Sequence, residues 1–339
     1  MLALQTAMRP ILLPLSFLYA AAIQIRNARY QSGSGVLRAP IPVISVGNIS
    51  VGGTGKTPLV IEIARRLIAA GRRPAILSRG YGGTATHEAD EVLEFRAALP
   101  DTLVVVNPDR AYGAESAAKL GADCAILDDG FQHRRLFREL DLVLIDAINP
   151  WAGNWVLPAG RLREPLGNLA RAGALIITRS NQVTLDEVDR IRRRLFQLSP
   201  GATIFRASVD PIAIVREDGS RESPENLGLS NVLPVCGIGN PRSFLRMIDL
   251  LAGHVAPPCI YRDHHEYTAA DVAAIIRRAR EEGSDIVLTT RKDWVKLLPL
   301  WKRGGPSRPS LAWLEARTSL GADAVALHER ILKAVEKRT

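Results

Sequence analysis

Short apolar runs alternate with amphipathic stretches through the first two thirds of the chain. Each run is apolar along its length, which is typical of a strand buried on both faces of a parallel sheet. Between the runs, apolar residues recur at helical spacing, as Val188, Ile191 and Leu195 do. The runs lie at 43–46, 73–78, 103–106, 124–127, 142–146 and 174–178. We therefore predict a doubly wound α/β domain that binds its ligands at the carboxyl ends of the strands.

The same alternation restarts in the last third of the chain after an interruption. Residues 202–208 and 212–216 are predicted as short strands, and the polar segment 217–231 as a loop. Later strands at 232–235 and 285–288 alternate with helices that end near 252 and that lie at 268–283 and 321–336. These patterns predict an N-terminal segment 1–30, a core domain 31–208, a linker 209–231 and a smaller α/β domain 232–339.

An uncharged segment, Pro10 to Ile25, precedes the first predicted strand, and Arg9, Arg26 and Arg29 flank it. A membrane-spanning helix needs about 20 apolar residues, and this segment is shorter and contains prolines. We therefore predict a helix that lies in the membrane interface, with its arginines on anionic headgroups. The alternative is a helix that packs on the protein's own core.

The segment Val43 to Thr57 reads V-I-S-V-G-N-I-S-V-G-G-T-G-K-T, and Pro58 opens a helix after it. Strand, glycine-rich turn and helix in this order are the setting of the phosphate loop of P-loop NTPases. Its backbone N–H groups would bind phosphates, Lys56 would reach the β- and γ-phosphates, and Thr57 would ligate Mg²⁺. We expect a nucleoside triphosphate to contact Val51, Gly52, Gly53, Thr54, Gly55, Lys56, Thr57 and Pro58. Ser50 departs from the pattern, which has glycine at that position.

Acidic residues follow the predicted strands on the same side of the sheet. Asp128 and Asp129 come directly after the apolar run C-A-I-L, and such buried acids are costly unless a metal ion or donors compensate them. Phosphoryl transfer needs a carboxylate there for Mg²⁺. Asp146 ends the next strand and is a weaker substitute. The alternative is a pair of turn aspartates before Gly130.

A base must take the proton of the acceptor hydroxyl. Asp90 and Glu91 are predicted to lie in a loop on the ligand side of the sheet, and Asp263-His264-His265 contains the paired histidines of the chain. A carboxylate and a histidine, one from each domain, could meet across a cleft. Spacing alone does not establish this, and the alternative, which is the commoner case for a lone acid–histidine pair, is that these residues lie on the surface.

The composition limits the kinds of partner. The net charge is +9, which favours acidic partners such as a nucleotide or an anionic membrane. Aromatic residues make up 5% of the chain and do not interleave with basic residues as a stacking platform requires, so nucleic acid is not an expected partner. The cysteines, Cys124, Cys236 and Cys259, lack the spacing of a zinc site or a disulfide framework.

Several motifs occur together and in a fixed order. They are S-V-G-N-I-S-V-G-G-T-G-K-T-P at 45–58, S-R-G-Y-G-G at 78–83, D-E at 90–91, D-D-G-F-Q-H at 128–133, L-P-A-G-R-L-R-E-P at 157–165, D-H at 263–264 and T-T-R-K-D at 289–293. The ordered set closely resembles the tetraacyldisaccharide 4'-kinases, the lipid A pathway kinases of Gram-negative bacteria. The resemblance covers nearly the whole chain.

The resemblance implies transfer of the γ-phosphate of ATP to the 4'-hydroxyl of an acylated glucosamine disaccharide 1-phosphate, which gives lipid IVA at the cytoplasmic face of the inner membrane. It implies Asp90 as the general base and His264 as its partner. By the same resemblance, the residues that organise Mg²⁺ and the phosphates are Thr57, Asp128, Asp129 and Glu164, and the supporting residues are Glu91, Arg79, Gln132 and Arg163. The family's loop also lacks the leading glycine, which accounts for Ser50, whereas Arg161 stands where the family often has proline.

The residues leave two other functions open. The first is a nucleotide switch, a GTPase or ATPase without a sugar substrate, because Thr290-Arg291-Lys292-Asp293 is similar to the guanine-reading T-K-x-D with its lysine displaced by one position. The second is a nucleic-acid-binding NTPase, for which binding would depend steeply on salt.

Overall fold

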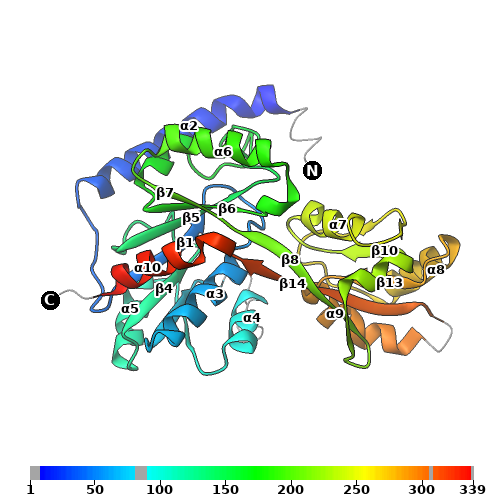
Figure 1. Cartoon of the computed structure of the whole chain (residues 1–339). Helices are drawn as coiled ribbons and strands as arrows, with labels where there is room; N and C mark the ends of the chain where they lie inside the picture. The colour runs from blue at the N-terminus through cyan, green and yellow to red at the C-terminus, as the bar shows by residue number, and fades with distance from the viewer. Residues whose placement is uncertain (1–7, 81–89, 305–307, 337–339) are drawn as a thin grey trace. The chain divides into compact units, whose positions relative to one another are not determined.

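The chain folds into two compact α/β units (Figure 1). The computed structural model describes residues 8–80, 90–304 and 308–336. The first unit comprises Met1–Ser208 with Leu320–Thr339, and the second comprises Val209–Ser319. Each unit contains a mainly parallel sheet with helices on it, so the predicted fold class is confirmed.

The sheet of the first unit has seven strands in the order β3-β2-β4-β1-β5-β6-β7, and every neighbouring pair is parallel. The strands are β1 (Val43–Asn48), β2 (Pro74–Ser78), β3 (Leu103–Val106), β4 (Cys124–Asp128), β5 (Leu140–Asp146), β6 (Ala174–Thr178) and β7 (Thr203–Arg206). The helices are α2 (Arg9–Gln31), α3 (Lys56–Ala69), α4 (Asp90–Ala98), α5 (Arg110–Lys119), α6 (Leu185–Leu198) and α10 (Ala324–Val335). The central strand β1 lies between β4 and β5, so its carboxyl end is flanked by the ends of both neighbours.

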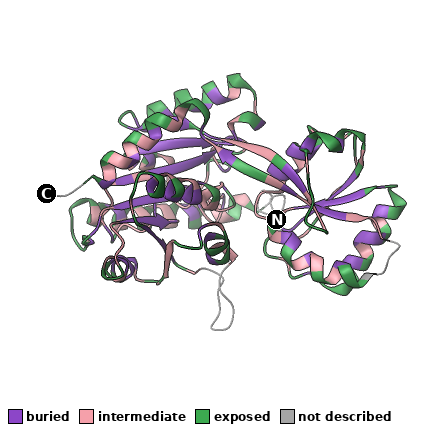
Figure 2. Cartoon of the chain, turned by 60° about the horizontal axis from the view of Figure 1, so that its bottom comes forward, coloured by how far each residue is buried: buried purple, intermediate pink, exposed green. Residues whose placement is uncertain are grey.

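Alternate residues of the strands enter opposite cores, which is why the runs are apolar throughout. Leu142 and Leu144 of β5 pack with helices α3, α4 and α10 on one face, whereas Val143 and Ile145 pack with α6 on the other. Strands β1, β2 and β4 meet α5 on that second face. The strands are accordingly buried while the helices expose their outer sides (Figure 2).

Helix α2 docks on the unit through a stripe of partly polar residues and turns apolar residues outward. The less exposed side, here called the docking stripe, comprises Leu12, Ser16, Tyr19, Ile23, Arg26, Asn27 and Tyr30. Large apolar side chains on the outer side are mostly exposed, as for Ile11 (72%), Phe17 (64%) and Leu18 (69%). By length and composition alone, α2 is able to cross a membrane, and 11% of its most apolar window is buried.

The second unit is a smaller sheet in the order β11-β10-β13-β14-β8-β9, with β12 also paired to β10. Its strands are β8 (Ser208–Arg216), β9 (Arg221–Glu222), β10 (Asn231–Cys236), β11 (His254–Val255), β12 (Cys259–Ile260), β13 (Ile286–Thr289) and β14 (Ser310–Ser319). Its helices are α7 (Pro241–Asp249), α8 (Ala269–Glu281) and α9 (Arg291–Trp301). Strands β10, β11, β12, β13 and β14 pair in parallel, whereas β8 and β9 are antiparallel.

The observed division differs from the predicted one at two places. Residues 209–231, predicted as a linker, contain β9 and most of β8 and belong to the second unit. The final helix, α10, was expected in the smaller domain, but its Leu327 and Ile331 are fully buried in the core of the first unit. An amphipathic pattern shows that a helix has an apolar side without showing which sheet covers it.

Further elements were not predicted. Asp90 and Glu91 begin helix α4 rather than lying in a loop, and α9, β14 and the short strands β11 and β12 were missed in the second unit. Helix α9 contains Pro299, and proline is normally a sign against helix. In each case tertiary packing outweighs the local pattern, as for Phe95 of α4, which is fully buried.

Candidate functional site

The predicted phosphate loop joins β1 to α3 at the centre of the first sheet. Gly52 and Gly55 adopt left-handed backbone angles, with φ of 116° and 87°, which favour glycine. Gly55 is the N-cap of α3, and among the described residues no side chain caps this end of the helix. The helix begins at Lys56, two residues before Pro58, so Lys56 and Thr57 form its first turn. An uncapped helix N-terminus after a glycine-rich loop can bind an anion.

Neighbouring strands hold the loop from below. Asn48 Nδ2 donates to Thr54 Oγ1 at 3.0 Å, and Thr178 Oγ1 at the end of β6 donates to the carbonyl oxygen of Thr54 at 3.0 Å. Arg179 Nη2 donates to the carbonyl oxygen of Gly53 at 2.8 Å. The loop is thus fixed before a ligand arrives, which lowers the entropy lost on binding.

Asp146, predicted as a substitute metal ligand, helps to hold the phosphate loop in this structure. It forms an ion pair of 2.8 Å with Arg179, and both side chains are almost fully buried. Arg161 supports the other end of the loop, because its Nη2 donates to the carbonyl oxygen of Val51 at 3.0 Å. The sequence interpretation missed Arg179 and Thr178, although their place at the end of an apolar run was a usable signal.

Lys56 faces Asp129 across the loop. Its Nζ lies 3.4 Å from Asp129 Oδ1, while Arg163 Nη1 lies 2.7 Å from Asp129 Oδ2. Burial favours a raised pKa for Asp129, but Lys56 and Arg163 outweigh it and lower that pKa, so the carboxylate is ionised at neutral pH. Arg163 also donates to Gln132 Oε1 at 3.2 Å, and Gln132 Nε2 donates to the carbonyl oxygen of Asn48 at 2.9 Å. The structure therefore brings together four of the predicted residues: Lys56, Asp129, Gln132 and Arg163.

Asp128 differs from Asp129 in the direction of its pKa shift. Its side chain is 2% exposed, and its Oδ1 accepts no hydrogen bond from any residue that the structure describes. Burial first, then the charges of Glu91 and Asp129, raise the pKa of Asp128 to about 7. The influence of Glu91 puts the start of α4 near this acid. A buried, unpartnered carboxylate oxygen of this kind is suited to a cation.

The donor set fits Mg²⁺. Asp128, Asp129 and the hydroxyl of Thr57 are oxygen ligands, and Mg²⁺ is usually held by one or two carboxylates together with phosphate oxygens and water. Within the described residues, no group of three or more His, Cys, Asp or Glu side chains forms a complete metal cage. Such a partial set is what a metal ion shared with a nucleotide needs.

Glu164, predicted to help organise Mg²⁺ and the phosphates, is bound by other residues in this structure. It is fully buried, its Oε1 lies 2.7 Å from Arg171 Nη2, and its Oε2 accepts from Asn27 at 2.8 Å and Asn168 at 2.9 Å. Burial favours a raised pKa for Glu164, but Arg171 outweighs it and lowers that pKa. Glu164 therefore anchors helix α2 through Asn27, and both of its oxygens have protein partners in this structure.

Asp90 begins helix α4 and is partly exposed. Residues 81–83 of the predicted basic loop lie outside the described residues, but Arg79 is described and exposed. Arg110, which the sequence interpretation missed, is buried to 5% exposure. Burial, followed by the nearby charge of Arg79, lowers the pKa of Arg110, and Asp128 and Asp129 counteract the shift. A second arginine thus lies close to the acids.

In the second unit, His264 and His265 have different surroundings. His264 is about half exposed, with φ of 63°, and its Nε2 lies 3.1 Å from Lys292 Nζ. His265 stacks on Tyr261 with ring centroids 4.6 Å apart and bonds Asp271 at 3.2 Å. His264 is thus the more exposed of the two histidines, and its predicted role beside Asp90 stays a prediction.

Asp293 holds the loop that carries His264. Its Oδ1 accepts from Tyr267 Oη at 3.1 Å, and its Oδ2 accepts from the backbone N–H of Gly237 at 3.0 Å and from Thr290 Oγ1 at 2.7 Å. The backbone N–H of His264 in turn donates to the carbonyl oxygen of Gly237 at 3.2 Å. Both carboxylate oxygens of Asp293 are occupied inside its own unit, so the similarity to a guanine-reading motif has no structural support.

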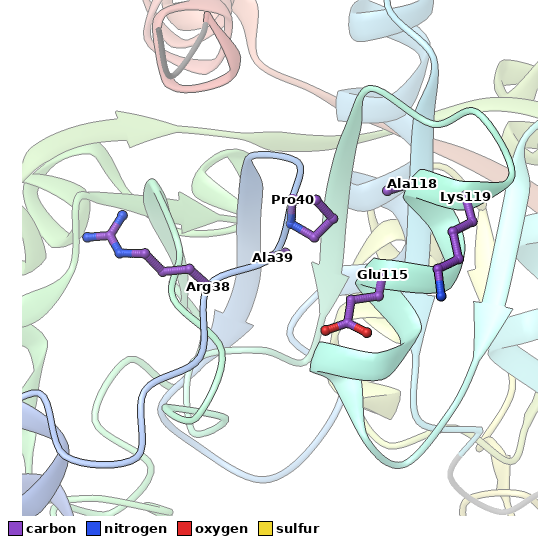
Figure 3. Close-up of a pocket in the computed structure, with 6 residues that line it drawn as sticks. All are labelled: Arg38, Ala39, Pro40, Glu115, Ala118 and Lys119. Atoms are coloured by element: carbon purple, nitrogen blue, oxygen red, sulfur yellow. The ribbon is translucent and has the colours of Figure 1, made fainter.

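A hollow of about 610 Å³ lies elsewhere on the first unit (Figure 3). It is lined by Arg38, Ala39, Pro40, Glu115, Ala118 and Lys119. These residues precede β1 or belong to the C-terminal half of α5, at the amino ends of the strands. Because parallel α/β sheets bind ligands at the carboxyl ends, this hollow is not the candidate site.

The comparisons with known proteins agree with one another. Residues 8–336 match the family model described as tetraacyldisaccharide-1-P 4'-kinase. The chain is 34% identical over 318 residues to the tetraacyldisaccharide 4'-kinase of Syntrophus aciditrophicus, covering 86% of this chain and 85% of that one. It is 36% identical over 328 residues to that of Anaeromyxobacter dehalogenans, covering 91% and 86%. Among solved structures, LpxK from Aquifex aeolicus in complex with ATP is 30% identical, with a TM-score of 0.69 over 98% of this chain and 99% of that one.

Proposed function

The chain belongs to the tetraacyldisaccharide-1-P 4'-kinase family, and from this premise we propose how its residues carry out the phosphoryl transfer. It is an ATP-dependent kinase of the 4'-position of a tetraacyldisaccharide 1-phosphate in lipid A biosynthesis. The observation that carries the proposed site is the Lys56–Asp129 pair next to the unpartnered oxygen of Asp128.

The phosphate loop, Val51 to Pro58, binds the triphosphate of ATP in this proposal. The N–H groups of the first turn of α3 point at the phosphates, and Lys56 exchanges Asp129 for the γ-phosphate as its counter-ion. The support from Thr178 and Arg179 keeps the loop in its binding shape. Mg²⁺ held by Asp128, Asp129 and Thr57 would neutralise charge on the phosphates.

The oxygen of the 4'-hydroxyl attacks the γ-phosphorus of ATP while Asp90 receives the proton of that hydroxyl. The bond between the γ-phosphorus and the bridging oxygen of the β-phosphate breaks, and ADP leaves. In this proposal His264 is the partner of Asp90, as the family resemblance implies, and within the second unit Lys292 Nζ lies 3.1 Å from the Nε2 of His264. Arg163, which pairs with Asp129, and Arg79, whose charge acts on Arg110, would stabilise the negative charge that develops in the transition state.

The decisive experiment measures ³²P transfer from ATP to a tetraacyldisaccharide 1-phosphate in detergent. We expect Asp90→Asn to lose about 10²–10⁴-fold in kcat with little change in ATP affinity, because only the proton acceptor is removed. Asp101→Asn, an exposed aspartate beyond the end of α4, is the matched control and should transfer normally. An equal loss of ATP binding in Asp90→Asn would assign Asp90 to the nucleotide instead.

Helix α2 lies on the cytoplasmic face of the inner membrane in this proposal. Its apolar side faces outward while polar side chains dock on the protein, the reverse of a core helix, and a lipid surface accounts for that arrangement. We expect Phe17→Ser to weaken binding to anionic vesicles by about tenfold. Phe196→Ser on α6 is the control, because Phe196 is equally exposed at 61%. Equal losses for the two variants would contradict the assignment to α2.

A further inference from the structure

Arg26 has an unusual place on the docking stripe of α2. Its Nε and Nη2 atoms are buried, and neither has a hydrogen-bond partner in residues 8–80, 90–304 or 308–336. It lies two helical turns after Tyr19, close enough that its charge acts on the Tyr19 hydroxyl. The neighbouring Arg29, by contrast, is exposed to solvent.

Two buried guanidinium nitrogens without a hydrogen-bond acceptor are costly at such a place. Arginine stays charged at every physiological pH, so it cannot avoid the cost of burial by losing its proton. Its N–H groups form a planar fork that matches carboxylate and phosphate oxygens. Buried polar groups without partners mark strain, function or an absent ligand.

The surroundings of Arg26 contain more positive than negative charge. Glu164, which faces the docking stripe, is already bound by Arg171 at 2.7 Å. Arg134 Nη1 donates to the carbonyl oxygen of Asn27 at 2.7 Å, and burial followed by repulsion from Arg171 and Arg138 lowers the pKa of Arg134. Arg26 and Arg134 thus bring to the docked side of α2 two cations that form no ion pair with the carboxylates the structure describes.

The position also connects the apolar surface to the site. Tyr19 Oη donates to the carbonyl oxygen of Arg163 at 2.9 Å, and the side chain of Arg163 binds Asp129 beside Lys56. The docking stripe is therefore joined through Tyr19 and Arg163 to Asp129, the acid that faces Lys56. On its other side, α2 exposes Phe17 and Leu18.

We propose that Arg26 binds the 1-phosphate of the acylated disaccharide acceptor. The acceptor carries acyl chains, an anionic phosphate and, at the far sugar, the reacting hydroxyl. The first unit offers a matching set of features: the exposed apolar side of α2, an arginine with two unpartnered nitrogens and the phosphate loop. This inference rests on the proposed function. A phosphate of an anionic phospholipid has the same chemistry, and the experiment must separate the two sources.

The experiment pairs an enzyme variant with a change in the acceptor. We expect Arg26→Ala to raise KM for the 1-phosphorylated acceptor by about tenfold or more with little change in kcat or in KM for ATP. With an acceptor that lacks the 1-phosphate, the native enzyme should already show the higher KM, and Arg26→Ala should add almost nothing. Arg26→Lys, which keeps the charge and loses the fork, should fall between the two.

Control variants distinguish binding of the 1-phosphate from a structural role and from binding of a phospholipid. Arg29→Ala should keep the native ratio of KM between the two acceptors. Equal losses of Arg26→Ala with the two acceptors would overturn the proposal, because they would mean a purely structural role. A second result would also overturn the proposal: Arg26→Ala loses binding to anionic vesicles without acceptor but still discriminates between the two acceptors. The phosphate that Arg26 binds would then be that of a phospholipid.

Two further outcomes complete the test. If Arg26→Ala does not fold, Arg26→Lys with native discrimination and native KM overturns the proposal as well. Absence of transfer by the native enzyme to either acceptor would instead refute the proposed function.

Discussion

The two sheets each carry a buried aspartate at a carboxyl end, and the two aspartates are held in opposite ways. Asp293 of the second unit is 2% exposed, and its oxygens accept from Gly237, Tyr267 and Thr290. Asp128 of the first unit is also 2% exposed, yet its Oδ1 has no partner among the described residues. The two acids are equally buried but have different roles. Asp293, with complete hydrogen bonding, fixes a loop, whereas Asp128, with incomplete hydrogen bonding, can accept a ligand.

The largest effect should come from removing Lys56, the cation beside Asp128 and Asp129. We expect Lys56→Ala to lower the transfer rate by about 10²–10³-fold, because it removes a charge that stabilises the developing negative charge on the phosphates. Initial rates at several ATP concentrations measure it. Lys119→Ala, at the far end of the strands, is the control. A rate within about threefold of the native enzyme would separate Lys56 from the phosphates.

Asp128→Asn should stabilise the protein in the absence of metal and nucleotide. The pKa of Asp128 is raised to about 7, so between about pH 4 and 7 the unfolded state releases a proton that the folded state keeps. Stability from this group is present below about pH 4 and lost as the pH rises through about 7. We expect the variant to exceed the native protein by about 2–4 kcal/mol at pH 8, and the gap to close toward pH 4.

Urea unfolding with EDTA at several pH values measures this gap. The prediction is specific to Asp128, whose hydrogen bonding is incomplete, because an acid with complete hydrogen bonds should lose stability on the same substitution. A variant that is less stable than the native protein at pH 8 would show that Asp128 has stabilising partners after all.

Asp293→Ala should act in the opposite direction and by a smaller amount. It leaves the N–H of Gly237 and the hydroxyls of Tyr267 and Thr290 without their acceptor, and we expect a loss of about 1–3 kcal/mol. Tyr267→Phe, which removes one of these bonds, should cost about 1 kcal/mol. Thermal unfolding at neutral pH compares the two. No loss in Asp293→Ala would remove the contrast with Asp128.

The phosphate loop, its strand and the acids after β4 were predictable from the sequence because each is local. Glycines with positive φ, a strand before them and a helix after them lie within one short segment, and their spacing carries the chemistry. The parallel first sheet was also predictable, since residues such as Leu142 and Val143 are apolar on both faces.

The missed features depend on partners that are far apart in the chain. Glu164 looked like a metal ligand beside Arg163, but Asn27, 137 positions away, takes one of its oxygens. Arg179 and Asp146 pair under the loop although neither lies in a motif that the chemistry required. Helix α10, near the C-terminal end of the chain, packs into the same core as α3, which lies in the N-terminal part. Pattern and spacing say what a residue can do, while the fold decides which partners reach it.

The most direct test of the contrast is the rate of ³²P transfer by Asp128→Asn with ATP, Mg²⁺ and the tetraacyldisaccharide acceptor. We expect the folded variant to retain about 1% of the native rate or less, because an amide is a poorer Mg²⁺ ligand than a carboxylate. A rate close to that of the native enzyme would mean that the unpartnered oxygen of Asp128 serves no ligand.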